Sequence, residues 1–293
     1  MMVYSDKTKS EFNDIIKASD SILLNLNNKN QSDLVTEFIN KSKKFIYKNF
    51  PFLSLDNSYN VEVHMEKENT VFGGSFTNEK NYLRGSNSSS SVINCTLGTP
   101  GKEQGNITLY LGDEKKDIKD LNNKEQRTRF GFNLFFTILH EIVHAKIDEL
   151  NKGQKSPYGL GYDESYMINE AFVYFTSYLI AKKITSDPDL LKTSGPANKL
   201  PDLSKIIKYE DFKKELAFSY RKVSVLSTQD SVDNLIFGEE LDDIIKTEKL
   251  VSNIYEKFNG GIGDFLNVIN GIRSLEQLFD LSDKYLKNQK PAI

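Results

Sequence analysis

The chain of 293 residues has no Trp and a single Cys, Cys95. One Cys can form neither an intramolecular disulfide nor a Cys-rich metal cluster. Positive charge is not in excess either, because 38 Lys and Arg stand against 41 Asp and Glu, a net charge of -3. Contacts to phosphates need concentrated positive charge, so the composition argues against a nucleic-acid-binding protein.

Long uncharged hydrophobic runs are also missing. The most apolar stretch, Phe130 to Ile147, contains two His and a Glu and is too polar to span a bilayer, so no membrane insertion is expected. Charged residues interrupt the first twenty positions, and no signal-peptide core is predicted. We expect a cytoplasmic protein by default. The alternative is a protein that is secreted or translocated without a cleaved signal, as some bacterial effectors are.

Hydrophobic periodicity predicts helices on both sides of a region of strands. Apolar residues at helical spacing predict helices over Lys9 to Leu24 and over Ser32 to Phe50. Short runs rich in β-branched and aromatic residues predict strands between Tyr59 and Gly112. Two apolar helices follow, over Lys124 to Leu150 and from about Ser165 to Ile184. The rest of the chain is expected to be mainly helical, and a capping box of Ser274 and Gln277 begins its last helix.

Two of the three His residues lie in one short motif, His140-Glu141-Ile142-Val143-His144. Positions four apart lie on one face of a helix, so both imidazoles can point at one metal ion. Glu141 can reach the edge of the same site and hold a water without binding the ion. Two neutral nitrogen ligands beside a carboxylate base form an HExxH zinc site. The alternative is a hydrogen-bonded pair of core histidines beside a solvated Glu.

The motif and its apolar surroundings, Phe130 to Ile184, resemble the zinc metallopeptidases of the zincin group. A catalytic zinc site needs a third protein ligand and an open position for water. The pair Asn169-Glu170 on the next predicted helix resembles the Asn-Glu pair of the gluzincin subgroup, in which a helical Glu completes the site. We therefore expect Glu170 to bind Zn²⁺ with His140 and His144. A solvent-facing Glu170 is one alternative, and the other candidate ligands are Asp163, Glu164 and Asp148.

The resemblance implies an α+β fold class with a zincin-like, two-lobed architecture. The N-terminal lobe, residues 1–153, is expected to contain a small β-sheet and the HExxH helix. The C-terminal lobe, residues 154–293, is expected to be mainly helical, and zinc is expected in the cleft between the lobes of one catalytic unit. The strand Ile107–Leu111 is expected to form a sheet edge with which a peptide substrate pairs, or otherwise to be internal.

The same resemblance implies a zinc-dependent metalloprotease, an endopeptidase acting on polypeptides, with Glu141 as general base for a zinc-activated water. No His follows the motif, so a Tyr or Arg is expected to stabilise the oxyanion. The sequence does not rank the candidates Tyr158, Tyr162, Tyr166, Tyr174, Arg221 and Arg273. A non-catalytic zincin-like module that binds a protein partner is the alternative function, and a metal-free helical interaction protein is a third. A housekeeping peptidase and a delivered effector protease both fit the sequence.

Overall fold

The computed structural model of the chain describes most of the helices with their side chains and the strands by their backbone pairing. The residues that it describes are 6–24, 31–55, 59–63, 73–78, 92–97, 105–110, 123–150, 164–185, 187, 190–191, 209, 212, 216 and 233–286.

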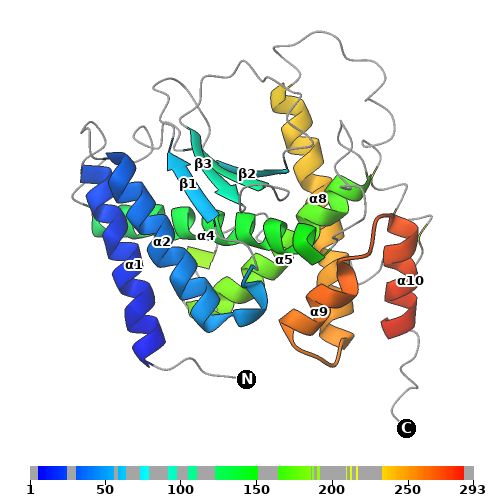
Figure 1. Ribbon diagram of the computed structural model, residues 1–293. Coiled ribbons are helices and arrows are strands. Elements are labelled where there is room, and N and C mark those ends of the chain that lie inside the picture. Colours follow the sequence, from blue (N-terminus) through cyan, green and yellow to red (C-terminus); the bar gives the residue numbers. More distant parts are fainter. Residues whose placement is uncertain are drawn as a thin grey trace. The chain divides into compact units, whose positions relative to one another are not determined.

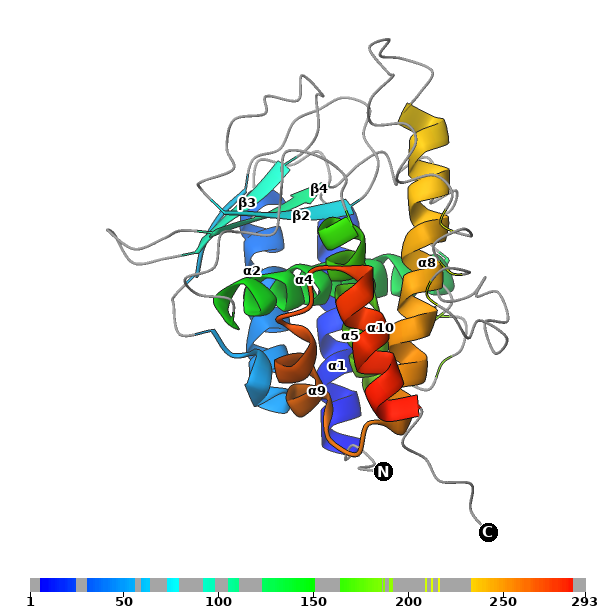
Figure 2. The ribbon, with the colours of Figure 1, turned by 90° about the vertical axis from the view of Figure 1, so that its right-hand side faces the viewer.

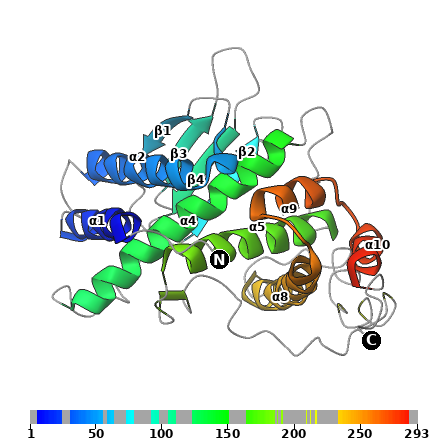
Figure 3. The ribbon, with the colours of Figure 1, turned by 90° about the horizontal axis from the view of Figure 1, so that it is seen from below.

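The first of two compact units comprises Met1–Glu149 and Ile180–Ser194. Its helices α1 (Asp6–Leu24) and α2 (Gln31–Asn49) lie side by side (Figures 1 and 3). The long helix α4 spans Lys124–Leu150, as its apolar periodicity predicts. Asn123 precedes this helix as its N-cap, because its side-chain Oδ1 accepts hydrogen bonds from the main-chain N–H groups of Glu125 and Gln126 at 2.9 and 3.2 Å.

Aromatic rings join α4 to the two N-terminal helices. The ring of Phe135 packs edge-on against Phe12 of α1 at 5.0 Å and against Phe45 of α2 at 5.9 Å, measured between centroids. The helices α1 and α4 approach closely at Gly131, where a Cβ atom would lie 2.8 Å from the main-chain oxygen of Ile16 and closer still to the Ser19 hydroxyl oxygen. The lack of a side chain at Gly131 therefore allows this contact, and it helps to hold α4 in a buried position.

Four short strands form an antiparallel sheet with the order β1-β3-β4-β2. Their bounds are β1 Tyr59–Val63, β2 Gly73–Asn78, β3 Val92–Leu97 and β4 Gly105–Tyr110. In the register, Cys95 of β3 lies between Val61 of β1 and Ile107 of β4, and β1 also contacts α2. Because β4 pairs with β3 on one side and with β2 on the other, the prediction that this strand forms a sheet edge is wrong. Its backbone hydrogen bonds are already used within the sheet.

The second unit comprises Leu150–Leu179 and Gly195–Ile293. It contains most of α5 (Glu164–Ile184), together with α8 (Asp233–Lys257), α9 (Ile262–Ile269) and α10 (Leu275–Leu286). Helices α8 and α10 lie against each other (Figure 2). Rings of Phe175, Tyr255 and Phe265 meet at centroid distances of 5.0 to 6.1 Å and join α5, α8 and α9. An aromatic core thus holds the three helices together.

Helix α1 begins three residues before its predicted start, and α2 lies within one residue of its predicted bounds. Both helices of the apolar pair, α4 and α5, lie within one residue of the predicted bounds. The capping box of α10 is also confirmed, because the Ser274 hydroxyl oxygen accepts the Gln277 N–H at 3.2 Å while the Gln277 side chain accepts the Ser274 N–H at 3.3 Å. No described helix is long and apolar enough to cross a membrane.

The predicted α+β fold class, with a zincin-like N-terminal β-sheet, is wrong. In the part of the chain whose side-chain packing is described, 88% of the residues are helical and no strand occurs. The fold is therefore mainly helical. The prediction gave too much weight to four β-branched runs, each of which forms a strand of only five or six residues. The described hydrophobic core is instead built by side chains of the long helices, such as Phe132, Phe135 and Phe172.

Candidate metal centre

Both histidines of the HExxH motif lie on α4 and point toward each other. Their Nε2 atoms are 3.1 Å apart, and their rings meet edge-on with centroids 4.7 Å apart. The side chains are almost enclosed, since His140 is 8% exposed and His144 is 4% exposed. The neighbours Leu139, Ile142 and Val143 are buried as well, so the motif is buried together with the rest of this apolar helix.

The distance between the two Nε2 atoms suits a shared metal ion. Zinc binds imidazole nitrogen at about 2.0–2.1 Å, and two tetrahedral ligands at that bond length lie about 3.3 Å apart. The observed 3.1 Å is close to that spacing. A neutral hydrogen-bonded pair of imidazoles would show a similar distance, so the third member of the group distinguishes the two interpretations.

Glu170 of α5 is the third member of this group. One ligand atom from each of His140, His144 and Glu170 can be chosen so that all lie within 4.8 Å of one another. Glu170 is 9% exposed, and a buried carboxylate requires a compensating partner. Among the described residues, this is the one group of three or more His, Cys, Asp or Glu side chains that meets this spacing. Two imidazoles and a carboxylate are a donor set that zinc accepts.

Glu141 and Asn169 are the polar residues beside these ligands in the chain. Glu141 follows His140 on α4 and is 2% exposed, while Asn169 precedes Glu170 on α5 and is also buried. The sequence predicted that Glu141 holds a water at the edge of the site. Its burial excludes the alternative in which this Glu is solvated, whereas its role as a base stays a prediction.

The alternative ligand Glu164 has a different partner in the structure. Its Oε1 accepts a hydrogen bond from the main-chain N–H of Leu275, at 2.6 Å and from 111 positions away in the sequence. Leu275 is the first residue of α10, so Glu164 satisfies a donor at the N-terminus of that helix and places negative charge there. Sequence reasoning missed this role because the contact is not local. Asp163 and the side chain of Asp148 lie outside the described residues.

The residue that stabilises the oxyanion stays unassigned. Nη1 of Arg273 donates to the carbonyl oxygens of Asn270 and Ile272, at 2.6 and 2.8 Å, so this guanidinium helps to hold the turn between α9 and α10. Tyr174 is half-buried on α5. The other predicted candidates lie outside the described residues or have side chains that do: Tyr158, Tyr162, Tyr166 and Arg221.

Lys146, two positions after His144, connects α4 to a segment distant in sequence. Its ammonium donates to the carbonyl oxygen of Ser54 at 2.9 Å and to Oε2 of Glu149 at 2.7 Å. Both side chains of this ion pair are mostly buried. Lys146 therefore ties the C-terminal half of α4 to the segment that follows the short 3-10 helix η1 (Pro51–Leu53), close to the metal ligands in sequence.

Two further buried acids, Glu248 and Asp243, lie on α8, away from the motif in sequence. Glu248 is 3% exposed, and burial raises the pKa of its carboxyl to about 7. Its neighbour Thr247 and the acid Asp243 on the same helix are also buried. Thr247 donates its hydroxyl to the carbonyl oxygen of Asp243 at 2.8 Å. Loss of hydration is the cause of the raised pKa, so Glu248 is largely protonated at slightly acidic pH.

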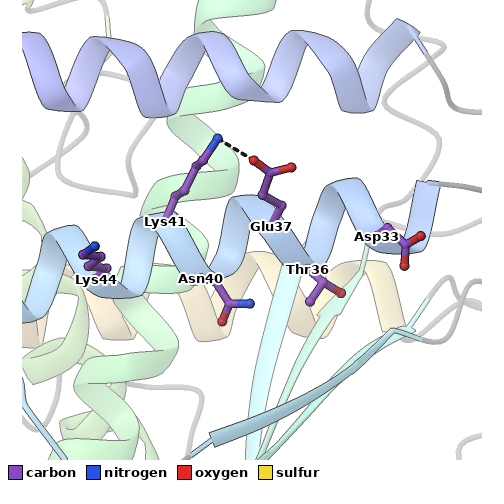
Figure 4. Close-up of a pocket in the computed structure, with 6 residues that line it drawn as sticks. All are labelled: Asp33, Thr36, Glu37, Asn40, Lys41 and Lys44. Carbon is purple, nitrogen blue, oxygen red and sulfur yellow. Dashed lines mark ion pairs between the residues drawn. The ribbon is translucent and has the colours of Figure 1, made fainter.

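A hollow of about 440 Å³ lies along α2 (Figure 4). Two acids and two lysines line it, and Glu37 forms an ion pair with Lys41 at 2.6 Å between exposed side chains. Exposed pairs of this kind contribute little to stability. Because both signs of charge lie on a single helix face, the hollow favours no class of ligand. The lining residues are Asp33, Thr36, Glu37, Asn40, Lys41 and Lys44.

Comparisons with known proteins add no further assignment. No protein family, curated protein or solved structure matches the chain.

Proposed function

We propose that the chain is a zinc-dependent endopeptidase. The observation that supports this function best is the buried group of His140, His144 and Glu170, with its ligand atoms within 4.8 Å of one another. The buried carboxylate of Glu141 lies next to that group in the chain. A purely structural zinc site uses four protein ligands, whereas three ligands leave a position for water.

Each residue of the group has a separate task in the proposed reaction. His140, His144 and Glu170 would hold the ion through two ring nitrogens and a carboxylate oxygen. When bound there, Zn²⁺ supplies a Lewis acid that lowers the pKa of water and polarises the scissile carbonyl. Glu141 accepts a proton from the attacking water and delivers it to the leaving amine, as general base and then general acid. Burial of these side chains keeps competing water away.

Metal analysis tests the first half of this proposal. We expect about one zinc per chain in the wild-type protein by elemental mass spectrometry, and a large loss in Glu170→Ala, since removing one of three ligands weakens binding. Glu164→Ala is the matched control, because it removes an acid of the same helix that contacts α10 instead. Full zinc occupancy in Glu170→Ala would exclude Glu170 as a ligand. A wild-type protein that takes up no zinc would overturn the proposal.

Activity tests the second half. The zinc-loaded wild type is expected to cleave fluorescently labelled casein or peptides from a proteome-derived library. Glu141→Gln should keep its zinc and lose turnover by about a hundredfold or more, because it removes the general base. A protein that binds zinc but cleaves none of these probes would point instead to the non-catalytic binding module.

A further inference from the structure

The central part of α4 is accessible at only two positions. Between Phe130 and Ala145, all of which is described, every residue is buried except Asn133 and Thr137, which are half-buried. A helix that is apolar on nearly all sides has no need of two polar residues at its centre. Their placement calls for a reason other than packing.

Both accessible residues lie on the face of α4 that bears the metal ligands. At 3.6 residues per turn, Asn133 is about 20° around the helix axis from His140, between the directions of His140 and His144. Thr137 is about 60° from His140 in the same sense. Asn133, Thr137, His140 and His144 therefore form one polar row, which we call the α4 row, and its accessible end lies toward the N-terminus of the helix.

The hydrogen bonds within the α4 row leave capacity for a ligand. The Thr137 hydroxyl donates to the main-chain oxygen of Asn133 at 3.0 Å, so its lone pairs remain as acceptors. Oδ1 of Asn133 is enclosed and receives no hydrogen bond from the part of the chain that the structure describes. An external ligand cannot reach this oxygen, so the exposed area of the half-buried Asn133 belongs to its other atoms, and Nδ2 of its amide remains as a donor.

We infer that Asn133, assisted by Thr137, binds the main chain of an extended polypeptide substrate; this inference rests on the proposed endopeptidase function. Nδ2 of Asn133 can donate to a main-chain carbonyl oxygen of the substrate, and the Thr137 hydroxyl can accept a main-chain N–H. Asn133 lies seven residues before His140, or about 10 Å along the helix axis. An extended peptide advances about 3.3 Å per residue, so the contact falls about three residues from the bond that is cleaved. A substrate bound at that distance from the cleaved bond is expected to be cut at an internal peptide bond rather than at a terminal one.

Kinetics on a defined peptide test this inference. A peptide that the wild type cleaves, identified by mass spectrometry from a proteome-derived library, is used as substrate. Asn133→Ala is expected to raise KM about three- to tenfold, the loss of one or two hydrogen bonds, with kcat within about twofold and zinc content unchanged. Asn133→Asp keeps the shape but has no Nδ2 donor, so it should raise KM at least as much. It also replaces Asn133→Ala if the alanine variant fails to fold.

Two threonines on α4 offer a matched comparison. Thr128 and Thr137 each donate to the carbonyl oxygen four residues earlier, at 2.9 and 3.0 Å, but Thr128 is about 120° away from His140. Thr137→Val should raise KM, whereas Thr128→Val should not. The binding of the same peptide to zinc-loaded Glu141→Gln, measured by fluorescence anisotropy with and without Asn133→Ala, gives a readout that does not need turnover. Its Kd should rise by the same factor as KM.

The outcomes separate this inference from the function on which it rests. If the wild type cleaves the peptide but Asn133→Ala and Thr137→Val have the KM and Kd of Thr128→Val, the α4 row does not bind substrate and the inference is wrong. If the zinc-loaded wild type cleaves nothing in the library, the endopeptidase proposal fails and the inference falls with it. A raised KM accompanied by loss of zinc would mean that Asn133 supports the metal site instead.

Discussion

Replacing Glu248 by Gln should make the protein more stable, and by an amount that depends on pH. The carboxyl is 3% exposed on α8, and burial raises its pKa from 4.5 to about 7. Because burial favours the protonated form, Glu248 does not lower the free energy of unfolding below about pH 4.5, where it is protonated in both states. Stability then falls as the pH rises toward 7, since the unfolded chain releases this proton more readily.

The size of the effect follows from the two pKa values. The shift from 4.5 to about 7 corresponds to about 3 kcal/mol of unfolding free energy. Most of this cost is present at pH 7.5 and almost none at pH 4. Gln has the shape of Glu without its charge, so Glu248→Gln should exceed the wild type by about 2–3 kcal/mol at pH 7.5 and match it at pH 4. Glu248→Met serves as a second variant because Gln also brings a donor that needs a partner.

Urea unfolding followed by far-ultraviolet circular dichroism measures this difference at both pH values. Glu256→Gln is the control, because it makes the same change at an exposed position of the same helix. Comparing variants at each pH cancels the contribution of all other titrating groups. A stability difference for Glu248→Gln that is the same at pH 4 and pH 7.5, within about 1 kcal/mol, would refute the argument from burial.

Two further predictions concern helix contacts. Gly131→Ala should lower the unfolding free energy by about 1–3 kcal/mol, because the new Cβ would lie 2.8 Å from the main-chain oxygen of Ile16, which cannot rotate away as a side chain can; thermal unfolding measures it, and an unchanged midpoint would contradict the close contact. Glu164→Ala should cost about 1 kcal/mol and speed hydrogen exchange at the Leu275 amide, which loses its acceptor; unchanged protection there would show that the cap is unimportant.

The long helices of the described chain could be predicted because their signals are local. For α4, an apolar pattern on several faces defines a helix of 27 residues without reference to the rest of the fold, and the structure adds a cap at Asn123. The same locality explains the success of the prediction for α10, whose capping box is contained within four residues. The fold class was predicted incorrectly because it depends on how elements pack, and strands of five or six residues give no measure of that.

The candidate site also combines local features, which can be predicted from the sequence, with contacts between elements, which cannot. The spacing of His140 and His144 is a property of one helix, so the sequence alone predicted that both imidazoles can point at one ion, and the structure places their Nε2 atoms 3.1 Å apart. Glu170 was selected by resemblance, and the structure adds that its carboxylate belongs to the same close group. The position of β4 between two other strands could not be predicted, because pairing partners are set by contacts distant in sequence.

Some polar residues have surroundings that only the packing of the helices reveals. Asn133 and Thr137 are ordinary residues for a helix, and only their incomplete burial on an otherwise enclosed segment separates them from their neighbours. Glu164 resembled a metal ligand until its contact with Leu275 was known. In both cases a residue's role depends on which face of its helix remains open and on what lies opposite. The HExxH motif could therefore be proposed as a metal site from sequence alone, whereas the residues proposed to bind its substrate were found only from the packing around it.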